Sequence, residues 1–295
     1  MKNLSDTHLG VFYALGAYLM WGFAPVYFKY LQFIPVYEIL AHRVVWSLLV
    51  TALIISYSNG WGNVLQLLQS PKKIALLALT SLLISGNWMM FIWAINNGYM
   101  LDASLGYFIN PIINVLFGLF FLQESLSRIK WLAVMLAVIG VSIQVVQLGE
   151  IPWIALFLAN SFAIYGLVRK KIKIAALTGL FVETLLVTPI ALYYLVYIAN
   201  GPSANMFENS WSLNIWLMFA GVVTAMPLIF FGQAALRLKL STLGFFQYLA
   251  PTLMFLFAVF IYAEPLSLVK MVTFVFIWLG VCLFACENKI QTWLK

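Results

Sequence analysis

Charged residues are scarce in this chain: aspartate, glutamate, lysine and arginine together make up only 8% of its 295 residues. Hydrophobic residues make up 64%, whereas an ordinary soluble domain is about half apolar and about a quarter charged. A soluble fold has no core large enough to bury so much apolar surface, so the composition predicts a protein whose solvent is the lipid bilayer. The formal net charge of +7 does not indicate nucleic-acid binding, because most basic residues stand between apolar runs.

Cysteine and histidine are also scarce, at two residues each. Cys282 and Cys286 lie in one apolar run without a nearby histidine, so we expect free, buried thiols and no metal or cofactor. The chain has no GxSxG or histidine-rich motif, so a membrane-embedded enzyme would lack a nucleophile with its base, and we expect no catalytic residues. A glycine-lysine loop that would bind ATP is absent too, which excludes ATP as the direct energy source.

Long hydrophobic runs are what the chain has in abundance. A helix needs about 20 mostly apolar residues to cross the bilayer core, and turn residues such as Asn59-Gly60 and Gly201-Pro202 separate the runs. We therefore predict an all-α polytopic membrane protein with ten transmembrane helices. Their expected ranges are 8–29, 35–57, 73–97, 102–123, 129–148, 152–169, 178–199, 212–236, 241–263 and 269–287.

Ten spans place both termini on one side of the membrane, and that side carries 13 of the 16 basic residues. The opposite side has only Lys29 and Lys270, while Arg43 lies inside a span. The positive-inside rule therefore predicts that both termini are cytoplasmic and that the loop 200–211 is external. The 13 basic residues are Lys2, Lys72, Lys73, Arg128, Lys130, Arg169, Lys170, Lys171, Lys173, Arg237, Lys239, Lys289 and Lys295.

One sequence pattern occurs twice. The stretch LGYFINPIINVLFGLFFLQESL (105–126) resembles the stretch LGFFQYLAPTLMFLFAVFIYAEPL (243–266). Matching residues are 140 positions apart, as in the pair Glu124 and Glu264 and in the pair Gly140 and Gly280. We predict two five-helix repeats, 1–150 and 151–295. Because each repeat has an odd number of spans, the second repeat crosses the membrane in the opposite direction to the first. Transporters use such inverted repeats to open a site at the membrane midplane to each side in turn. The alternative is a duplication kept only for folding. Each glutamate ends a helix and is expected to be a structural latch beside a lysine or arginine.

Several stretches resemble the drug/metabolite transporter superfamily, its EamA family and, within that family, the RarD branch. They are AYLMWGFAPVYFK, EILAHRVVWS, GNWMMFIWAINN, DASLGYFINP, YGLVRKK and STLGFFQYLAPTLMF. The resemblance covers essentially the whole chain. It implies a multi-pass permease of the bacterial inner membrane, whose ten helices surround a central cavity with the fifth and tenth at the periphery. It implies no particular substrate, since superfamily members move amino acids, nucleotide sugars, cations, purines and drugs.

Ionisable residues at membrane depth cost about 3 kcal/mol each and mark candidate sites. His42 and Arg43 lie in the second expected span, and Glu183 lies in the seventh, 140 residues after Arg43. Arg43 and Glu183 therefore occupy equivalent positions in the two repeats and either pair with each other or bond separately to other groups. His42 projects about 100° away from Arg43 around the helix. Proton coupling would use Glu183 or His42, whereas exchange or passive transport would need neither.

Amide and aromatic side chains at membrane depth complete the candidate site. Asn110 and Asn114 lie on one face of the fourth span, and an amide inside hydrocarbon needs a partner, which is another helix, water or a solute. Hydrogen bonding between helices is therefore the alternative to solute binding. The expected substrate-binding residues are Trp21, Asn87, Trp88, Tyr107, Asn110, Asn114, Gln247 and Tyr248.

These observations favour a secondary transporter that moves a small organic solute, such as an amino acid, a metabolite or a drug, by alternating access. A passive facilitator or channel for small solutes is the alternative, and a membrane-embedded enzyme has less support. The expected partners are the solute and the lipid bilayer, without nucleic acid, and assembly as a homodimer is left open.

Overall fold

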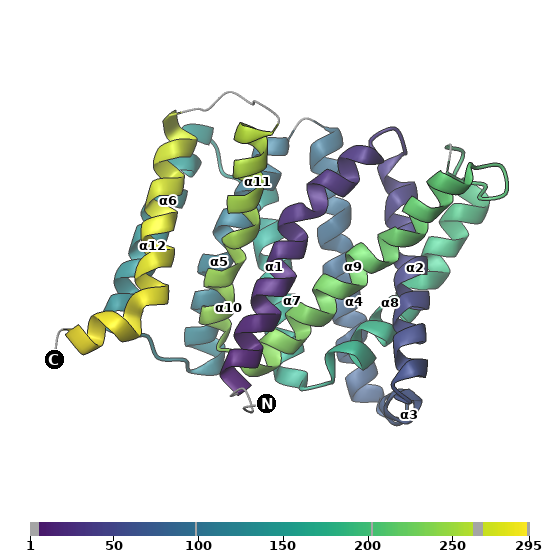
Figure 1. Cartoon of the computed structure of the whole chain (residues 1–295), viewed down its shortest axis with the longest axis horizontal. Helices are drawn as coiled ribbons and strands as arrows, with labels where there is room; N and C mark the ends of the chain where they lie inside the picture. Colours follow the sequence, from purple (N-terminus) through teal and green to yellow (C-terminus); the bar gives the residue numbers. More distant parts are fainter. Residues whose placement is uncertain (1–5, 98, 202, 262–267, 294–295) are drawn as a thin grey trace. The chain divides into compact units, whose positions relative to one another are not determined.

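The computed structural model describes residues 6–97, 99–201, 203–261 and 268–293, and every regular element in these ranges is a helix (Figure 1). The elements are α1 (Asp6–Tyr30), α2 (Val36–Tyr57), α3 (Trp61–Leu68), α4 (Pro71–Asn96), α5 (Met100–Leu122), α6 (Arg128–Leu148), α7 (Trp153–Ile172), α8 (Ala176–Tyr193), the π-helical segment η1 (Tyr194–Ile198), α9 (Trp211–Arg237), α10 (Leu240–Gln247), α11 (Leu249–Phe260) and α12 (Leu268–Trp293). The prediction of an all-α protein is therefore confirmed over the described residues.

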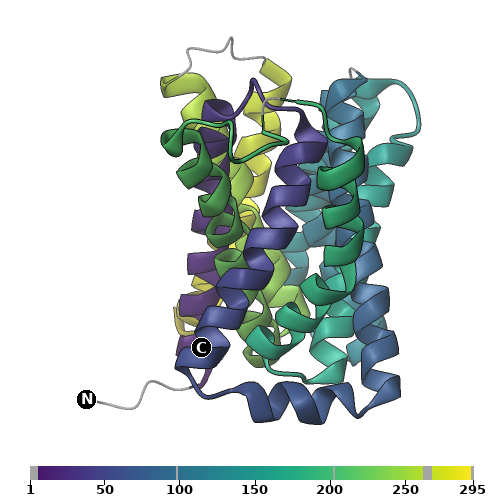
Figure 2. The same cartoon turned by 90° about the vertical axis from the view of Figure 1, so that its right-hand side faces the viewer.

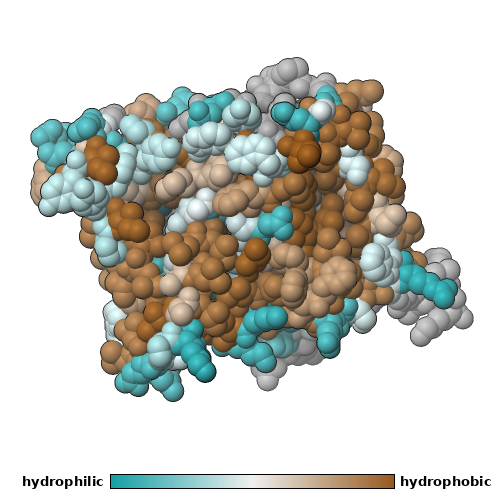
Figure 3. Space-filling model, turned by 180° about the vertical axis from the view of Figure 1, so that it is seen from behind, coloured by the Kyte–Doolittle hydropathy of each residue, from teal (hydrophilic) through white to brown (hydrophobic). Residues whose placement is uncertain are grey.

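Nine stretches of the described helices are long and apolar enough to cross a membrane. On the face seen in Figure 3, hydrophobic residues cover the middle parts of the helices, and hydrophilic residues gather near their ends. The sixth expected span, 152–169, corresponds to α7, which is not among the nine and carries Arg169, Lys170 and Lys171 in its last turn. The tenth span therefore stays a prediction. Glu264, at the end of the ninth expected span, lies outside the described residues.

The chain folds into two compact units, and each unit draws on both predicted repeats. Unit 1 comprises residues 1–92 and 168–237, and unit 2 comprises residues 93–167 and 238–295. Unit 1 thus holds α1, α2, α3, most of α4, α8 and α9, with the last turn of α7. Unit 2 holds α5, α6, most of α7, α10, α11 and α12.

Unit 1 is built around α9, which packs against α1, α2 and α8. A side chain at Gly221 of α9 would place its Cβ 2.4 Å from the backbone of Trp46, so α2 and α9 approach closely only because this residue is a glycine. The short helix α3 lies crosswise at one end of the unit, between α2 and α4 (the dark-blue helix at the bottom of Figure 2). At eight residues it is too short to span a membrane, and it does not correspond to any of the ten expected spans.

Unit 2 contains two main helix pairs, α6 with α12 and α5 with α10. In the first pair, an added Cβ at Gly140 would lie 3.0 Å from the Thr273 carbonyl oxygen, and one at Gly280 would lie 2.8 Å from the Ala133 carbonyl oxygen. Each helix therefore approaches the other's backbone at its own glycine. Cys282 and Cys286 are free but exposed, so the expectation of buried thiols is wrong, because the part of α12 that carries them is only partly covered by its unit.

The end of α5 meets the start of α10 through Glu124. Its carboxylate accepts hydrogen bonds from the backbone N–H groups of Leu240, at 2.6 Å, and Ser241, at 3.0 Å. Backbone amides and a hydroxyl therefore hold this glutamate in the described structure, in place of the expected lysine or arginine. The start of a helix supplies unsatisfied N–H groups and a partial positive charge, which suit a carboxylate.

Candidate functional site

Unit 1 contains a small cavity, partly open and with a volume of about 20 Å³, between four of its helices, α2, α4, α8 and α9. Two residues that the sequence singled out, Trp88 and Glu183, lie in its wall. The remaining lining residues are mainly aliphatic, with hydroxyl groups from α4 and α8. The complete lining is Val44, Ser81, Ile84, Ser85, Trp88, Leu180, Glu183, Thr184, Val187 and Leu228.

Glu183 is buried, with 2% of its side chain exposed, and its hydrogen bonds link α8 to α4. The Thr80 hydroxyl donates to a Glu183 carboxylate oxygen at 2.6 Å, and the Ser81 hydroxyl donates to the Glu183 backbone carbonyl at 3.1 Å. The same carboxylate oxygen lies 3.6 Å from Nη1 of Arg169. A carboxylate at this depth needs such partners because the membrane interior supplies no water to solvate it.

The sequence does not predict a role for Arg169 beside Glu183, because its position at the end of an apolar run places it among the 13 basic residues of the cytoplasmic side. It is 4% exposed, and its Nη2 donates to the Ala176 carbonyl at 3.1 Å. The neighbouring Lys170 instead donates to the Ala235 carbonyl at 3.0 Å. The run Arg169-Lys170-Lys171 resembles an ordinary interfacial cluster, and only the turn into α8 brings Arg169 beside Glu183.

Arg43 is held on the α2 side of the cavity. Its Nε donates to the Thr224 hydroxyl of α9 at 2.8 Å. Its guanidinium carbon lies 4.5 Å from the Trp88 ring centroid and 5.2 Å from that of Phe28, which are distances typical of cation–π contacts. Arg43 and Glu183 both belong to unit 1, and pairing between them stays a prediction.

His42 and Glu38 bind the connection between α8 and α9, away from the cavity lining. Glu38 accepts hydrogen bonds from the backbone N–H of Gly201, at 2.6 Å, and of Ser203, at 3.2 Å, and also from the Ser203 hydroxyl. His42 Nε2 lies 3.1 Å from the Ser203 carbonyl oxygen. Both side chains are almost fully buried. Their described contacts give them a role in fastening a loop to α2, and a role of His42 in coupling is untested.

The predicted amide cluster forms within unit 2, where three helices meet. Asn110 donates to the Ala159 carbonyl of α7, and Asn114 donates to the side-chain oxygens of Asn110, at 2.8 Å, and Gln247, at 3.3 Å. All three amides are at most 5% exposed. Hydrogen bonding between helices, the alternative to solute binding, thus accounts for these contacts, whereas the Asn114 side-chain oxygen has no hydrogen bond within the described residues.

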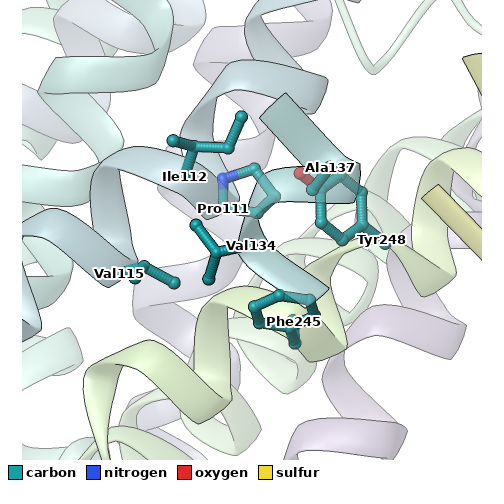
Figure 4. Close-up of a pocket in the computed structure, with 7 residues that line it drawn as sticks. All are labelled: Pro111, Ile112, Val115, Val134, Ala137, Phe245 and Tyr248. Carbon is teal, nitrogen blue, oxygen red and sulfur yellow. The ribbon is translucent and has the colours of Figure 1, made fainter. Parts of the chain in front are cut away.

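A second, apolar pocket, too narrow to hold a water molecule, lies beside this cluster in unit 2 (Figure 4). Pro111 and Ile112 of α5 line it together with Val134 of α6 and Phe245 of α10. Tyr248 also lines it, and its hydroxyl donates to the Phe108 carbonyl at 3.2 Å. Because its phenol group is used in this way, the wall of this pocket is almost only apolar.

The remaining predicted residues are divided between the units. In unit 1, Trp21 packs against Tyr18 and Phe231, at ring-centroid distances of 5.5 and 5.9 Å, and Asn87 is buried. In unit 2, Tyr107 is 38% exposed, unlike the buried Asn110 one turn later. The expectation that Trp21 and Tyr107 line one cavity stays a prediction. No group of three or more metal-ligating side chains occurs in the part of the chain that the structure describes.

Comparison with known proteins agrees with this membrane architecture. A family model described as the EamA-like transporter family matches residues 8–146. A protein named RarD from Salmonella typhimurium is 55% identical over 97% of both chains, and one from Escherichia coli is 51% identical over 97% of this chain and 96% of its own. An uncharacterized transporter from Vibrio cholerae is 51% identical over 96% of this chain and 94% of its own.

The fold is shared with a solved structure of low sequence similarity. A crystal structure described only as that of a protein matches with a TM-score of 0.70, at 18% identity, over 96% of this chain and 98% of that chain. The sequence relatives extend the similarity over nearly the whole length at an identity well above that level. The chain therefore belongs to the EamA-like transporter family, as a RarD-like multi-pass membrane protein of a bacterial transporter family.

Proposed function

We propose that this transporter moves a small organic solute across the bacterial inner membrane by alternating access, with both termini in the cytoplasm. The observation that carries the proposal is the unit 1 cavity. It places a carboxylate and an indole, Glu183 and Trp88, in the wall of a small cavity among membrane-spanning helices. Ionisable groups at membrane depth commonly mark solute or ion pathways.

The lining indicates the kind of solute. Aliphatic side chains such as Leu180 and Leu228 suit an apolar body, and the hydroxyls of Ser85 and Thr184 supply a few orienting hydrogen bonds. Binding sites for small molecules typically combine a mainly apolar wall with a small number of placed polar groups. A solute that is partly apolar and carries at least one polar or charged group fits this lining.

The inverted repeat and the ten spans form part of the same proposal, with α7 as the tenth span. The α6–α12 contacts support the repeat. Gly140 lies 140 residues before Gly280, and the residues that they approach, Ala133 and Thr273, are also 140 apart. A two-fold relation between the repeats produces such reciprocal contacts, because each helix then presents the same surface to the other. Each repeat would adopt in turn the conformation of the other.

Counterflow in proteoliposomes tests the function directly. Vesicles that contain the purified protein are preloaded with unlabelled pools of amino acids, nucleosides or amines, and uptake of the labelled pool is measured with and without a proton gradient. A carrier accelerates uptake when its solute is also present on the far side, whereas a channel shows no such acceleration. Failure of every pool to exchange would reject the proposal, and uptake without acceleration would favour the passive facilitator.

The variant Glu183→Gln links the activity to the unit 1 cavity, because it keeps the size of the side chain and removes its charge. We expect a large loss of counterflow. Glu150→Gln is a suitable control, since Glu150 is an exposed glutamate beyond the end of α6. Unchanged counterflow in folded Glu183→Gln protein would show that transport does not depend on the charge in this cavity.

A further inference from the structure

Arg169 lies at one end of the unit 1 cavity. The lining residues of α8 run from Leu180 to Val187, and those of α4 run from Ser81 to Trp88. Arg169 contacts α8 at Ala176, which precedes the lining, and at Glu183, one turn after Gly179 and near the start of the lining on this helix. Arg169 and Thr80 therefore both contact the Glu183 carboxylate near the end of the cavity that the proposed topology assigns to the cytoplasm.

Glycines provide the space for the arginine side chain. At Gly179, one turn before Glu183, an added Cβ would lie 1.9 Å from Arg169 Nη1, a distance at which the guanidinium would have to move. At Gly232 of α9, an added Cβ would lie 3.4 Å from Arg169 Nη2. A side chain at Gly179 would thus block the path of Arg169 to Glu183, so the surfaces of α8 and α9 fit this arginine in its buried position.

The contact between the two charges is loose. Arg169 Nη1 and the Glu183 carboxylate oxygen are 3.6 Å apart, whereas charge-assisted hydrogen bonds are about 2.7–2.9 Å long. Nη1 is buried and makes no hydrogen bond within the described residues, while the same carboxylate oxygen accepts the Thr80 hydroxyl at 2.6 Å. Arg169 can therefore move away from Glu183 without breaking a hydrogen bond between them, and Thr80 continues to satisfy the carboxylate.

We propose that Arg169 is a positioning residue for transport, which holds the cytoplasmic end of the unit 1 cavity closed through Glu183 and withdraws from it once in each cycle. The proposal rests on the proposed transport function and deepens it, by naming the contact that opens and closes one end of the site. Arg169 approaches Glu183 from outside the cavity lining, so its effect on the solute passes through Glu183.

Cysteine accessibility tests the closure without any solute. Ser85, in the cavity lining, is changed to cysteine in a background in which Cys282 and Cys286 are serine. Inside-out vesicles expose the cytoplasmic side to a small, charged thiol reagent. We expect the labelling rate at position 85 to rise several-fold when Gly179→Ala displaces the guanidinium or when Arg169→Gln removes its charge. Arg169→Lys should stay close to the parent rate.

The control is Gly62→Ala, because an added Cβ at Gly62 in α3 meets nothing within 4 Å. Its labelling rate should equal that of the parent. Arg169→Gln alone leaves a buried carboxylate without its cation and therefore destabilises the fold. The double variant Arg169→Gln/Glu183→Gln leaves no such charge, so it provides a folded protein in which the contact is absent, and it should label as fast as Gly179→Ala.

Parent-like labelling in the folded double variant, or an equal rise in Gly62→Ala, would overturn the proposal. Counterflow distinguishes this failure from failure of the transport function. If the parent protein exchanges solute and folded Gly179→Ala keeps both the parent exchange rate and the parent labelling rate, the gate is rejected and the transporter stands. If the parent exchanges no solute while labelling still rises as expected, the transport proposal fails instead.

Discussion

The carboxylate of Glu124 joins the end of α5 to the start of α10 through Ser241, accepting its backbone N–H at 3.0 Å and its hydroxyl at 2.6 Å. We expect Glu124→Ala to lower the free energy of unfolding by about 1–3 kcal/mol, because the N–H groups of Leu240 and Ser241 lose their acceptor. Ser241→Ala removes one hydroxyl and should cost less. Thermal unfolding in detergent measures both, with the exposed Glu150→Ala as control. Equal melting temperatures for Glu124→Ala and Glu150→Ala would refute this role.

The α6–α12 interface gives a second stability prediction. Gly280→Ala should destabilise the protein by about 1–3 kcal/mol, because the new methyl group meets the Ala133 carbonyl oxygen and forces the helices apart. Gly86→Ala is the matched control, since the space around Gly86 in α4 is open and alanine is the better helix former by about 1 kcal/mol. The two melting temperatures should move in opposite directions. A rise for both variants would show that the interface is looser than described.

The connection after α8 should depend on the absence of a side chain at Gly201. In Gly201→Ala the new Cβ would lie 2.3 Å from a Glu38 carboxylate oxygen, so we expect the carboxylate to be displaced and the loop to loosen. Hydrogen exchange of the Ser203 amide, which donates to Glu38 at 3.2 Å, should accelerate. Exchange near Asn214, in α9, should change little. Slow exchange at Ser203 in the variant would mean that Glu38 does not hold the loop.

The membrane topology predicts the accessibility of Asn205. This residue is exposed in the loop 200–211, which the positive-inside rule assigns to the external side. Asn205→Cys, with Cys282 and Cys286 replaced by serine, should react with an impermeant thiol reagent in intact spheroplasts. Lys72→Cys, at the start of α4, should react only in inside-out vesicles. The reverse pattern would invert the topology and move Arg169 to the external side.

The variant Asn110→Ala separates solute recognition from helix packing. Because Asn110 bonds to Ala159 and to Asn114, we expect a loss of stability of about 1–3 kcal/mol. If the cluster also contacts the solute, the KM for exchange should rise in the protein that remains folded. Thermal unfolding and counterflow on one preparation give both values. A lower melting temperature with an unchanged KM would assign the cluster to packing alone.

The sequence predicts the helical elements well because the bilayer sets their length and apolar character. Asn110, Asn114 and Gln247, which the sequence groups, do lie together, whereas Tyr107 of the same group is 38% exposed, and solute binding by these residues stays a prediction. The partner of Glu183 was less predictable. Arg169 follows an apolar run and precedes two lysines, which is the usual pattern of a membrane interface, and its burial depends on the space left by Gly179. Such a fit between elements far apart in the sequence leaves no periodic signal along the chain.

The short helix α3 gives unit 1 a defined depth in the bilayer. It buries Val64 and Leu67 against the unit and leaves Leu65 and Leu68 exposed, while the Trp61 indole donates to the Ser56 hydroxyl at 3.0 Å. A helix that has an exposed apolar side and lies across the ends of membrane-spanning helices typically binds at the boundary between lipid headgroups and acyl chains. We therefore expect α3 to fix the position of that end of unit 1 at one leaflet. In a thicker or thinner membrane, we expect the difference between the hydrophobic length of unit 1 and the bilayer thickness to arise at the opposite leaflet. There the segment η1 and the loop bound by Glu38 would have to adjust their conformation.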